Sequence, residues 1–439
     1  MIGILKKDSF LFLIRKARKL IPNRLVNLLF HLPSSILAII FYRYPAGKLK
    51  VIGVTGTDGK TTTATLIYEI LKKVDKKVAL ISTVSARIGD KELPTGLHIT
   101  TPNPWELQKL IRFVSDKGFE YLVLEVTSHG LAQFRTFGCN FLIGVITNVT
   151  NEHLDYHHTW KEYLLAKAKL FYGVKYKILN KDDRSFSFLR GIGKGNIISY
   201  SIKKNAFVKA INIAFRKNFS QFEYQYLDIM QLSKKLKKVK IVTPLLGEYN
   251  IYNCLAAIAA VKTLGIGDRE IQKTIKAFIG VTGRMEAIKN KRGFKVIVDF
   301  AHTPNGLENA LRTIREVYKP KKIIAVFGCA GLRDRTKRPK MGEIAFNLAD
   351  YIVLTAEDPR IENVNSIIEE ISRGCREKKK IFRKPDRLEA INFAINKLAK
   401  KGDVVGIFGK GHEQSMCFGT KEYPWSDKEA VLKTLKKGV

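Results

Sequence analysis

The sequence of residues 53–63, GVTGTDGKTTT, has the glycines, lysine and threonines of a phosphate-binding loop but fits neither common pattern. The pattern G-x-x-x-x-G-K-[ST] requires a glycine six positions before the lysine, where this chain has Val54. The pattern G-x-G-x-x-G fails because the glycines fall at 53, 56 and 59. The loop nevertheless lies between a strand-like run, KVIGVTG, and a helix-like run, TTTATLIYEILKKV. In that context, backbone N–H groups and a helix N-terminus bind anionic oxygens, so we predict a phosphate site.

Short apolar runs alternate with helical periods from residue 49 onward, which predicts an α/β fold with a mostly parallel sheet covered on both faces. A second alternating block begins near residue 283, and a more irregular, β-rich stretch covers 172–245. We expect a central ATP-binding domain over 49–282, a second α/β domain over 283–439 and a short helical segment over 1–48.

The N-terminal segment is basic and apolar. Residues 1–24 carry charges inside their apolar run and have no small-residue cleavage site, which argues against a signal peptide. Residues 26–43, VNLLFHLPSSILAIIFYR, are short for a membrane span and are interrupted by His31, Pro33 and two serines. We predict two amphipathic helices that pack on the body of the protein, with peripheral contact to a membrane surface as the alternative.

Charge and cysteine content limit the classes of protein to which the chain can belong. The chain has 439 residues and a net charge of +37. The charge suggests nucleic-acid binding, but the lysines are spread along the whole chain without a helix-turn-helix or RNA-binding signature. A lysine-rich surface on an enzyme with anionic substrates is the favoured interpretation, with no nucleic-acid partner. Five scattered cysteines without a C-x-x-C pair indicate a reducing compartment and argue against a cysteine zinc site.

Three further residues have the chemistry of a metal and phosphate site. Glu125 ends the strand-like run YLVLE, where an unpaired carboxylate is costly and Mg²⁺ would remove that cost; a salt-bridged strand end is the alternative. His153 is expected to close a strand in the same block. Lys167 lies in the apolar run YLLAKAKLF, where burial lowers the pKa of a lysine and leaves a neutral amine.

The chain resembles the Mur ligases, and within them the MurE branch, which adds the third residue of the peptidoglycan stem to a UDP-N-acetylmuramoyl-dipeptide. The resemblance covers about residues 49–439 and rests on ten stretches in the family's order: GTDGKTTT, TTPNPWEL, EVTSHGLAQFR, TNVTNEHLDYHHTWKEYLLAKAKLF, LLGEYNIYNCLAA, VTGRMEAI, VDFAHTPNGLENAL, VFGCAGLRDRTKRPKMGEIA, EDPR and GKGHEQ. It implies a central P-loop ATPase domain and a C-terminal Rossmann-like domain that closes over it.

The resemblance also implies residue roles. Catalysis is expected from Lys60, Glu125, His153 and Lys167. The expected ATP-binding residues are Gly56, Thr57, Asp58, Gly59, Lys60, Thr61, Thr62, Asn253, Arg284, Asp299, His302 and Lys337. Two Mg²⁺ ions are implied, with Thr61 and Glu125 on one and His153 and Lys167, as a CO₂-derived carbamate, on the other. The muramoyl-peptide acceptor is assigned to Thr100, Thr101, Thr127, Gln133 and Arg135. The incoming amino acid is assigned to Asp358, Arg360, Gly411 and Glu413.

The implied reaction is an ATP-dependent amide ligation through an acyl phosphate, carried out by a cytoplasmic monomer on small-molecule substrates. Arg360 in EDPR favours meso-diaminopimelate as the added residue, because an arginine fork grips a distal carboxylate. Asp358 stands where the family often has asparagine, and an acid there suits a cationic side chain such as that of L-lysine. An ion pair of Arg360 with Glu357 or Glu362 is the purely structural alternative.

The sequence departs from the family pattern at two places. Only 48 residues precede the first ATPase strand, fewer than the family's UDP-binding domain needs, so a different or lipid-linked acceptor stays open. The stretch GCAGLRDR has Ala330 and Leu332 where many relatives have glycine and aspartate, but it keeps its basic residues. A nucleic-acid-stimulated P-loop ATPase is the alternative from another class of protein.

Overall fold

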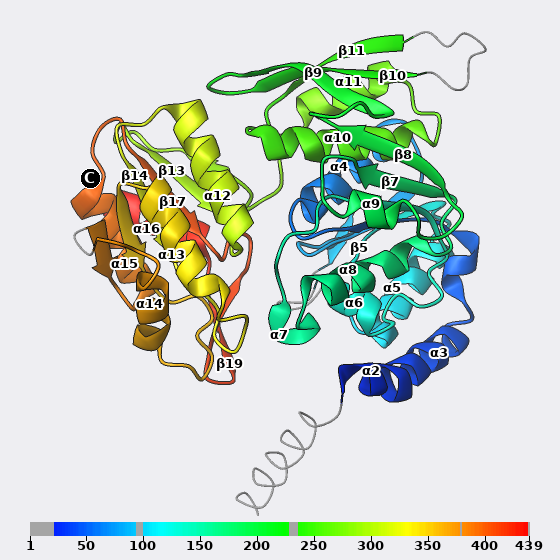
Figure 1. Ribbon diagram of the computed structural model, residues 1–439, viewed down its shortest axis with the longest axis horizontal. Coiled ribbons are helices and arrows are strands. Elements are labelled where there is room, and N and C mark those ends of the chain that lie inside the picture. Colours follow the sequence, from blue (N-terminus) through cyan, green and yellow to red (C-terminus); the bar gives the residue numbers. More distant parts are fainter. Residues whose placement is uncertain (1–21, 94–99, 228–235, 378–379, 438–439) are drawn as a thin grey trace, which may run out of the picture.

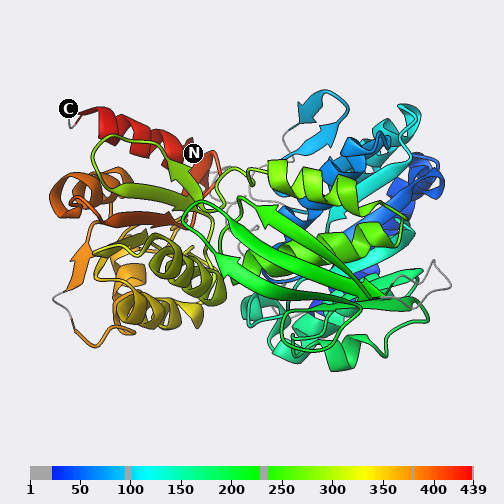
Figure 2. The same ribbon diagram turned by 90° about the horizontal axis from the view of Figure 1, so that it is seen from above.

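The computed structural model describes residues 22–93, 100–227, 236–377 and 380–437. Residues 1–21, which hold most of the first predicted N-terminal helix, lie outside the described residues. The described chain forms two α/β lobes that lie side by side (Figures 1 and 2), and the predicted fold class is confirmed.

The first lobe is built on an 11-stranded sheet with the order β11-β10-β9-β8-β7-β6-β1-β5-β2-β3-β4. The strands from β9 to β2 pair in parallel, and an antiparallel hairpin extends each edge. Its strands are β1 (Lys50–Thr55), β2 (Val78–Ile81), β3 (Ala86–Ile88), β4 (Lys91–Leu93), β5 (Tyr121–Glu125), β6 (Phe141–Ile146), β7 (Tyr176–Asn180), β8 (Asn196–Ser201), β9 (Val208–Phe215), β10 (Ser220–Leu227) and β11 (Leu236–Thr243).

Helices cover both faces of this sheet, as the continuous apolar character of β1 requires (Figure 1). One face packs on α4 (Lys60–Lys73), α10 (Glu248–Lys262) and α11 (Asp268–Ala277). The other packs on α5 (Pro104–Asp116), α6 (Ser128–Ala132), α8 (Trp160–Ala168), η3 (Lys169–Phe171) and α9 (Phe186–Leu189). The short α7 (Leu154–His157) precedes α8.

The second lobe has a six-stranded sheet with the order β12-β13-β17-β14-β15-β16, parallel except for β12. Its strands are β12 (Glu286–Ile288), β13 (Lys295–Asp299), β14 (Ile323–Phe327), β15 (Tyr351–Leu354), β16 (Ile381–Arg383) and β17 (Val404–Phe408), followed by the hairpin β18 (Ser415–Phe418) and β19 (Lys421–Pro424). Its helices are α12 (Pro304–Thr313), η4 (Ile314–Tyr318), α13 (Lys337–Leu348) and α14 (Val364–Ser372) on one face, and α15 (Arg387–Phe393), η6 (Ala394–Leu398) and α16 (Asp427–Lys437) on the other.

The N-terminal part of the described chain is one continuous helix over Asn23–Phe41, made of α2 (Asn23–Val26), η1 (Asn27–His31) and α3 (Leu32–Phe41). The turn η2 (Pro45–Lys48) links it to β1. The helix lies against α5 at the outer edge of the first lobe (Figure 1), as the second predicted N-terminal helix requires.

Candidate functional site

The phosphate loop joins β1 to α4 at the carboxyl edge of the first sheet. Gly59 caps α4 with φ of 82°, and a Cβ there would lie 2.2 Å from Oδ1 of Asn253, so only glycine fits. Lys60 is the first residue of α4, and its Nζ donates to the carbonyl of Thr57 at 2.8 Å. Burial lowers the pKa of Lys60, while the carboxylates of Glu125 and Asp58 oppose that shift. The loop therefore places a half-buried lysine at a helix N-terminus.

A cleft of about 350 Å³ opens between this loop and the second lobe. Its walls include most of the predicted nucleotide residues, and only two of them are placed elsewhere. The lining residues from the predicted set are Thr57, Asp58, Gly59, Lys60, Thr61, Thr62, Asn253, Arg284, Asp299 and His302. Gly56 instead presents its carbonyl to Lys167, and Lys337 lies beside the cleft against Glu152 and His302.

Glu125 lies at the end of β5 directly beside the loop. Its Oε1 accepts from Thr61 Oγ1 at 3.1 Å, and its Oε2 accepts from the backbone N–H of Thr83 at 2.9 Å. The side chain is buried, and no arginine or lysine among the described residues forms an ion pair with it, which disfavours the salt-bridged alternative. Mg²⁺ commonly takes one carboxylate and a hydroxyl from the protein and the rest from phosphates and water, so this pair fits the ion.

Lys167 projects from α8 toward the same edge. It is buried, its Nζ donates to the carbonyl of Gly56 at 2.6 Å, and it lies 4.5 Å from the centre of the Tyr163 ring. Burial, and next the charge of Lys60, hold the pKa of Lys167 well below its usual value. Burial therefore favours the neutral amine, which is the form that can react with CO₂.

His153 lies in the same region, but its local structure differs from the predicted one. It does not close a strand: β6 ends at Ile146, and His153 stands in the left-handed region with φ of 57° as the residue before α7. Its ring lies 4.7 Å from that of His129 and 6.2 Å from that of Tyr163. Burial, and then the neighbouring His129 and Lys337, hold its pKa well below 6.5, so it offers a neutral imidazole.

The predicted acceptor residues form one connected group beyond the end of β5. Thr101 Oγ1 lies 3.1 Å from Thr127 Oγ1, and the carbonyl of Thr101 accepts from Arg135 at 2.7 Å. Arg135 also donates to Gln133 Oε1 at 2.9 Å. Thr100 joins the group through Thr83, whose N–H binds Glu125. The predicted acceptor residues thus adjoin the Thr61–Glu125 pair. Burial lowers the pKa of Arg135.

The second lobe contributes two cations in or beside the cleft, Arg284 from the segment before β12 and Lys337 from the start of α13. Arg284 donates to Thr61 Oγ1 at 3.3 Å and stacks on Phe300 at 4.3 Å, while its buried Nε has no partner among the described residues. Lys337 donates to Glu152 Oε1 at 3.2 Å and to the carbonyl of His302 at 2.8 Å. Arg284 therefore meets the first lobe at the phosphate loop, and Lys337 meets it at Glu152.

Asp58 has a second role that the motif did not indicate. Its Oδ1 accepts from Thr303 Oγ1 at 3.2 Å, and its Oδ2 accepts from Asn305 Nδ2 at 2.6 Å. Thr303 caps α12 by accepting from the N–H of Gly306. The loop residue thus binds the first turn of a helix in the other lobe. Asp299, at the end of β13, accepts from the N–H groups of Met285 and Ala301, and burial raises its pKa.

The residues assigned to the amino acid fall into two sets. Asp358 Oδ1 accepts from Lys410 Nζ at 2.8 Å and from the N–H of Cys417 at 3.0 Å, and Glu413 lies 2.5 Å from the same amine. Gly411, with φ of 54°, packs against Phe300 and the carbonyl of Gly283. An internal lysine therefore occupies the position at which a cationic substrate side chain was expected.

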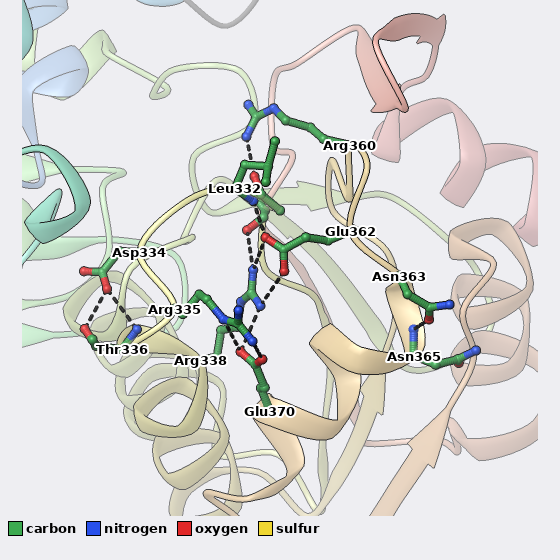
Figure 3. A network of polar contacts seen from close by, with 12 residues as sticks. Leu332, Asp334, Arg335, Thr336, Arg338, Arg360, Glu362, Asn363, Asn365 and Glu370 are labelled. Atoms are coloured by element: carbon green, nitrogen blue, oxygen red, sulfur yellow. Dashed lines mark hydrogen bonds and ion pairs between the residues drawn. The ribbon is translucent and has the colours of Figure 1, made fainter. Parts of the chain in front are cut away.

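Arg360 is held by a backbone carbonyl and not by these carboxylates. Its Nη1 donates to the carbonyl of Gly331 at 2.6 Å, and no carboxylate among the described residues forms an ion pair with it. Figure 3 shows that Glu362 and Glu370 instead face the buried Arg338, at 2.9 Å each. The structural alternative, a pair of Arg360 with Glu357 or Glu362, is therefore not formed.

Two sequence profiles of known protein domains match this chain. That of the Mur ligase middle domain matches residues 54–261, and that of the Mur ligase glutamate ligase domain matches residues 283–411. The chain belongs to the Mur ligase family of ATP-dependent ligases.

Two curated relatives of this Mur ligase are UDP-N-acetylmuramoyl-L-alanyl-D-glutamate–2,6-diaminopimelate ligases. That of Caldanaerobacter subterraneus subsp. tengcongensis is 38% identical over 397 residues, which covers 90% of this chain and 80% of that protein. That of Aquifex aeolicus is 40% identical over 397 residues, with 90% and 79% covered. A solved structure of a ligase of the same name is 30% identical with a TM-score of 0.60, covering 89% of this chain and 78% of that one. The resemblance to the MurE branch is confirmed.

Three residues of this Mur ligase site were missed by sequence reasoning. Glu152, which follows Asn151 in the motif TNVTNEH, is buried, and its Oε2 has no partner among the described residues. The side-chain amide of Asn148 accepts from the N–H of Asp58 and donates to its carbonyl, and the backbone carbonyl of Asn148 accepts from the N–H of Thr57. Lys410 forms ion pairs with both Asp358 and Glu413. Glu152 could have been found as the acid beside His153, but the partners of Lys410 come from segments far apart in the sequence.

Proposed function

We propose that this Mur ligase joins meso-diaminopimelate to the terminal glutamate carboxylate of UDP-N-acetylmuramoyl-L-alanyl-D-glutamate in peptidoglycan precursor synthesis. The observation that carries the proposal is the convergence of the phosphate loop, Glu125, Lys167 and the acceptor group at the carboxyl edge of one sheet. The names of the two curated relatives supply the substrates. Ligands of parallel α/β folds bind at this edge.

The reaction we propose has two steps. An oxygen of the acceptor carboxylate attacks the γ-phosphorus of ATP, the bond to the β–γ bridging oxygen breaks, and ADP leaves. Two anions repel each other unless their charge is neutralised, and Lys60 and Arg284 are the cations that line the cleft at this point. The amine of the amino acid then attacks the carbonyl carbon of the acyl phosphate, loses a proton and expels inorganic phosphate.

We assign two Mg²⁺ positions by the chemistry of the residues present. Thr61 and Glu125 would hold one ion, and His153 with a carbamate on Lys167 would hold the other. The ions would neutralise the phosphate oxygens during transfer. No group of three histidine, cysteine, aspartate or glutamate side chains suited to a metal occurs among the described residues. We therefore propose that phosphate, carbamate and water oxygens would complete the ligand sets.

Contacts between the lobes supply the closed state that the acyl phosphate needs. Asp58 to Asn305 and Lys337 to Glu152 join the phosphate loop region to the second lobe on either side of the cleft. Closure excludes water, which would otherwise hydrolyse the intermediate. We place the division between the lobes at Thr282 and Gly283, and propose a cytoplasmic monomer whose N-terminal segment contacts a membrane surface.

The structure favours diaminopimelate over lysine. Arg360 is a guanidinium without a carboxylate partner among the described residues, as a site for a distal carboxylate requires. Asp358 already forms an ion pair with Lys410 and accepts from the N–H of Cys417, so its Oδ1 is engaged within the protein. The main support for a lysine-adding enzyme is thereby weakened.

The test is an assay with ATP, Mg²⁺ and UDP-N-acetylmuramoyl-L-alanyl-D-glutamate in which the amino acid is varied. We expect a tripeptide product with meso-diaminopimelate and at least about a hundredfold lower kcat/KM with L-lysine, from the loss of a bidentate contact. Product with lysine at equal efficiency would overturn the amino-acid assignment. No product with any amino acid would overturn the acceptor.

A further inference from the structure

The helix Asn23–Phe41 exposes an unusual amount of apolar surface. It has 19 residues and a mean hydropathy of 1.6, and it is the one helix among the described residues long and apolar enough to cross a membrane. Only 22% of the residues in its apolar window are buried. Its exposed large apolar side chains are Leu25, Leu28, Leu29, Phe30, Ile36, Leu37, Ile40 and Phe41. Exposed apolar surface of this extent marks an interaction site.

The helix is nevertheless fixed to the body along one side, so it does not stand free as a span. Ser35 and Ala38 are buried toward α5, and Trp105 of α5 donates to Ser34 and packs against Phe41 at 5.7 Å. At the other end, Asn27 donates to the hydroxyl of Tyr156 at 3.1 Å. One face of the helix is therefore committed to the protein, and the opposite face is the apolar one that remains exposed.

A second cavity adjoins this helix and carries positive charge. It has a volume of about 800 Å³ and is lined mainly by apolar and aromatic side chains such as Phe134 and Phe137. Gly138, on its wall, packs against Ile39 of the helix. The cations Lys169 and Lys175 stand at its edge, and Arg24 of the helix is near enough to Lys169 that its charge adds to burial in lowering the pKa of Lys169.

These cations are not neutralised by the protein. No carboxylate among the described residues forms an ion pair with Arg24, Lys169 or Lys175. Lys169 instead lies 4.3 Å from the centre of the Phe134 ring. In the sequence from 22 to 57 there are four lysines and arginines and no aspartate or glutamate. An apolar face bordered by uncompensated positive charge is complementary to a bilayer that presents acyl chains beneath anionic headgroups.

We propose that the exposed face of the helix Asn23–Phe41 docks in the plane of an anionic bilayer, with lipid phosphates at Arg24, Lys169 and Lys175. The inference deepens the membrane contact proposed above but does not depend on the ligase reaction. Tyr156 links the two regions, because it binds Asn27 and also accepts from Gln133 of the acceptor group at 3.5 Å. Docking would thus hold the acceptor site next to the membrane surface.

Sedimentation with lipid vesicles tests the proposal on the full chain. We expect binding to vesicles of phosphatidylcholine with phosphatidylglycerol and at least tenfold weaker binding to phosphatidylcholine alone, since each basic residue near an anionic surface contributes about fivefold. Phe30→Glu with Leu37→Glu should lower binding at least tenfold, because both exposed side chains enter the acyl region. Ile279→Glu with Leu432→Glu is the matched control at exposed apolar positions elsewhere, and should bind like the parent.

The proposed contact of Lys169 and Lys175 with lipid phosphates is tested by a second pair of variants. Lys169→Glu with Lys175→Glu should lower binding to the anionic vesicles at least tenfold, whereas Lys397→Glu with Lys400→Glu, on the second lobe, should lower it less than threefold. Circular dichroism checks that each variant is folded.

Three results would overturn the proposal. They are equal binding to both kinds of vesicle, no binding to either, and a concentration-dependent dimer in light scattering that the Phe30 and Leu37 changes abolish, which would assign the face to a second copy. Vesicle binding that appears only after removal of residues 1–21 would also contradict the proposal, because it would mean that this segment occupies the apolar face in the full chain. Because binding is read without ATP, its failure leaves the ligase assignment untouched.

Discussion

Lys337 of α13, in the second lobe, reaches Glu152 of the first lobe beside the cleft, with Nζ 3.2 Å from Oε1, and the same amine donates to the carbonyl of His302 at 2.8 Å. Both side chains are buried, and the remaining oxygen of Glu152 has no partner among the described residues. A buried ion pair between lobes is formed only when the lobes meet, so it reports closure at the cleft that holds the phosphate loop.

Lys337→Met should therefore lower kcat by on the order of a hundredfold or more, because it removes a cation that acts on the phosphates at closure. It should also destabilise the closed form, since it leaves Glu152 buried without its partner. Lys340→Ala, an exposed residue of the same helix, is the control and should retain full activity. The double variant with Glu152→Gln separates the two effects: stability should return while kcat stays low. Recovery of kcat in the double variant would mean that Lys337 serves only the ion pair.

Lys167→Ala should lower kcat by on the order of a thousandfold, from the loss of an anionic ligand beside the transferred phosphate. Lys161→Ala, an exposed lysine on the same helix, should be silent. A readout independent of activity is the carbamate resonance in the ¹³C spectrum of protein equilibrated with labelled bicarbonate. That resonance should be present in the parent and absent in Lys167→Ala. The assignment would be refuted if the parent showed no carbamate resonance and the Lys167→Ala variant were as active as the parent.

Asp58→Asn should weaken the contact with the second lobe, because an amide cannot accept on both sides as the carboxylate does from Thr303 and Asn305. We expect a loss in kcat/KM for ATP of roughly tenfold, equal to one or two hydrogen bonds. The exchanged pair Asp58→Asn with Asn305→Asp restores one donor and one acceptor and should regain part of that loss. Small-angle scattering with ATP bound should show the single variant more open. If the exchanged pair has the same kcat/KM for ATP as the single variant, Asp58 acts on the nucleotide and not on the contact between the lobes.

The alternation of apolar strands and helices was enough to predict the two α/β lobes, the helices on both faces and the phosphate loop, because these follow from local pattern and glycine spacing. The convergence of Lys60, Glu125, His153 and Lys167 on one region agrees with the predicted grouping of those positions. The local position of His153 was wrong, since a left-handed residue before a single-turn helix leaves no periodic signal.

Contacts that join distant segments were not predictable in the same way. Lys410 lies more than fifty positions from Asp358, and nothing in either motif shows that the two are paired. The same holds for Asp58 and Asn305, which belong to different lobes. The hairpins β3–β4 and β18–β19 were also missed, because their strands of three and four residues are too short to show a clear period.

Arg360→Lys should raise the KM for diaminopimelate at least tenfold with a smaller change in kcat, because a lysine makes one contact where the guanidinium fork makes two.

Asp358→Asn should behave differently from the Arg360 variant. It leaves Lys410 with Glu413 alone, so the main effect should be on thermal stability and not on the choice between diaminopimelate and lysine. A switch of preference toward or away from lysine in Asp358→Asn would show that Asp358 contacts the substrate.

Glu357 gives a pH prediction. Burial raises the pKa of this carboxyl from 4.5 to about 8, so the folded protein keeps the proton in a range where the unfolded chain has lost it. The free energy of unfolding should therefore fall as pH rises from about 4.5 to about 8, by on the order of 1–3 kcal/mol from this residue. Glu357→Gln should flatten that part of the profile in urea melts and be the more stable protein at pH 8. Parallel profiles for parent and variant would show that Glu357 is ionised in the fold.

The most direct measurement is the fate of oxygen in the first step. The acceptor is prepared with ¹⁸O in the glutamate carboxylate that forms the amide, and the phosphate released with ATP, Mg²⁺ and diaminopimelate is examined by mass spectrometry. Activation of the acid by the γ-phosphate at the loop around Lys60 predicts one ¹⁸O in each phosphate released. Phosphate without the label, from turnover that still forms the tripeptide, would contradict an acyl phosphate.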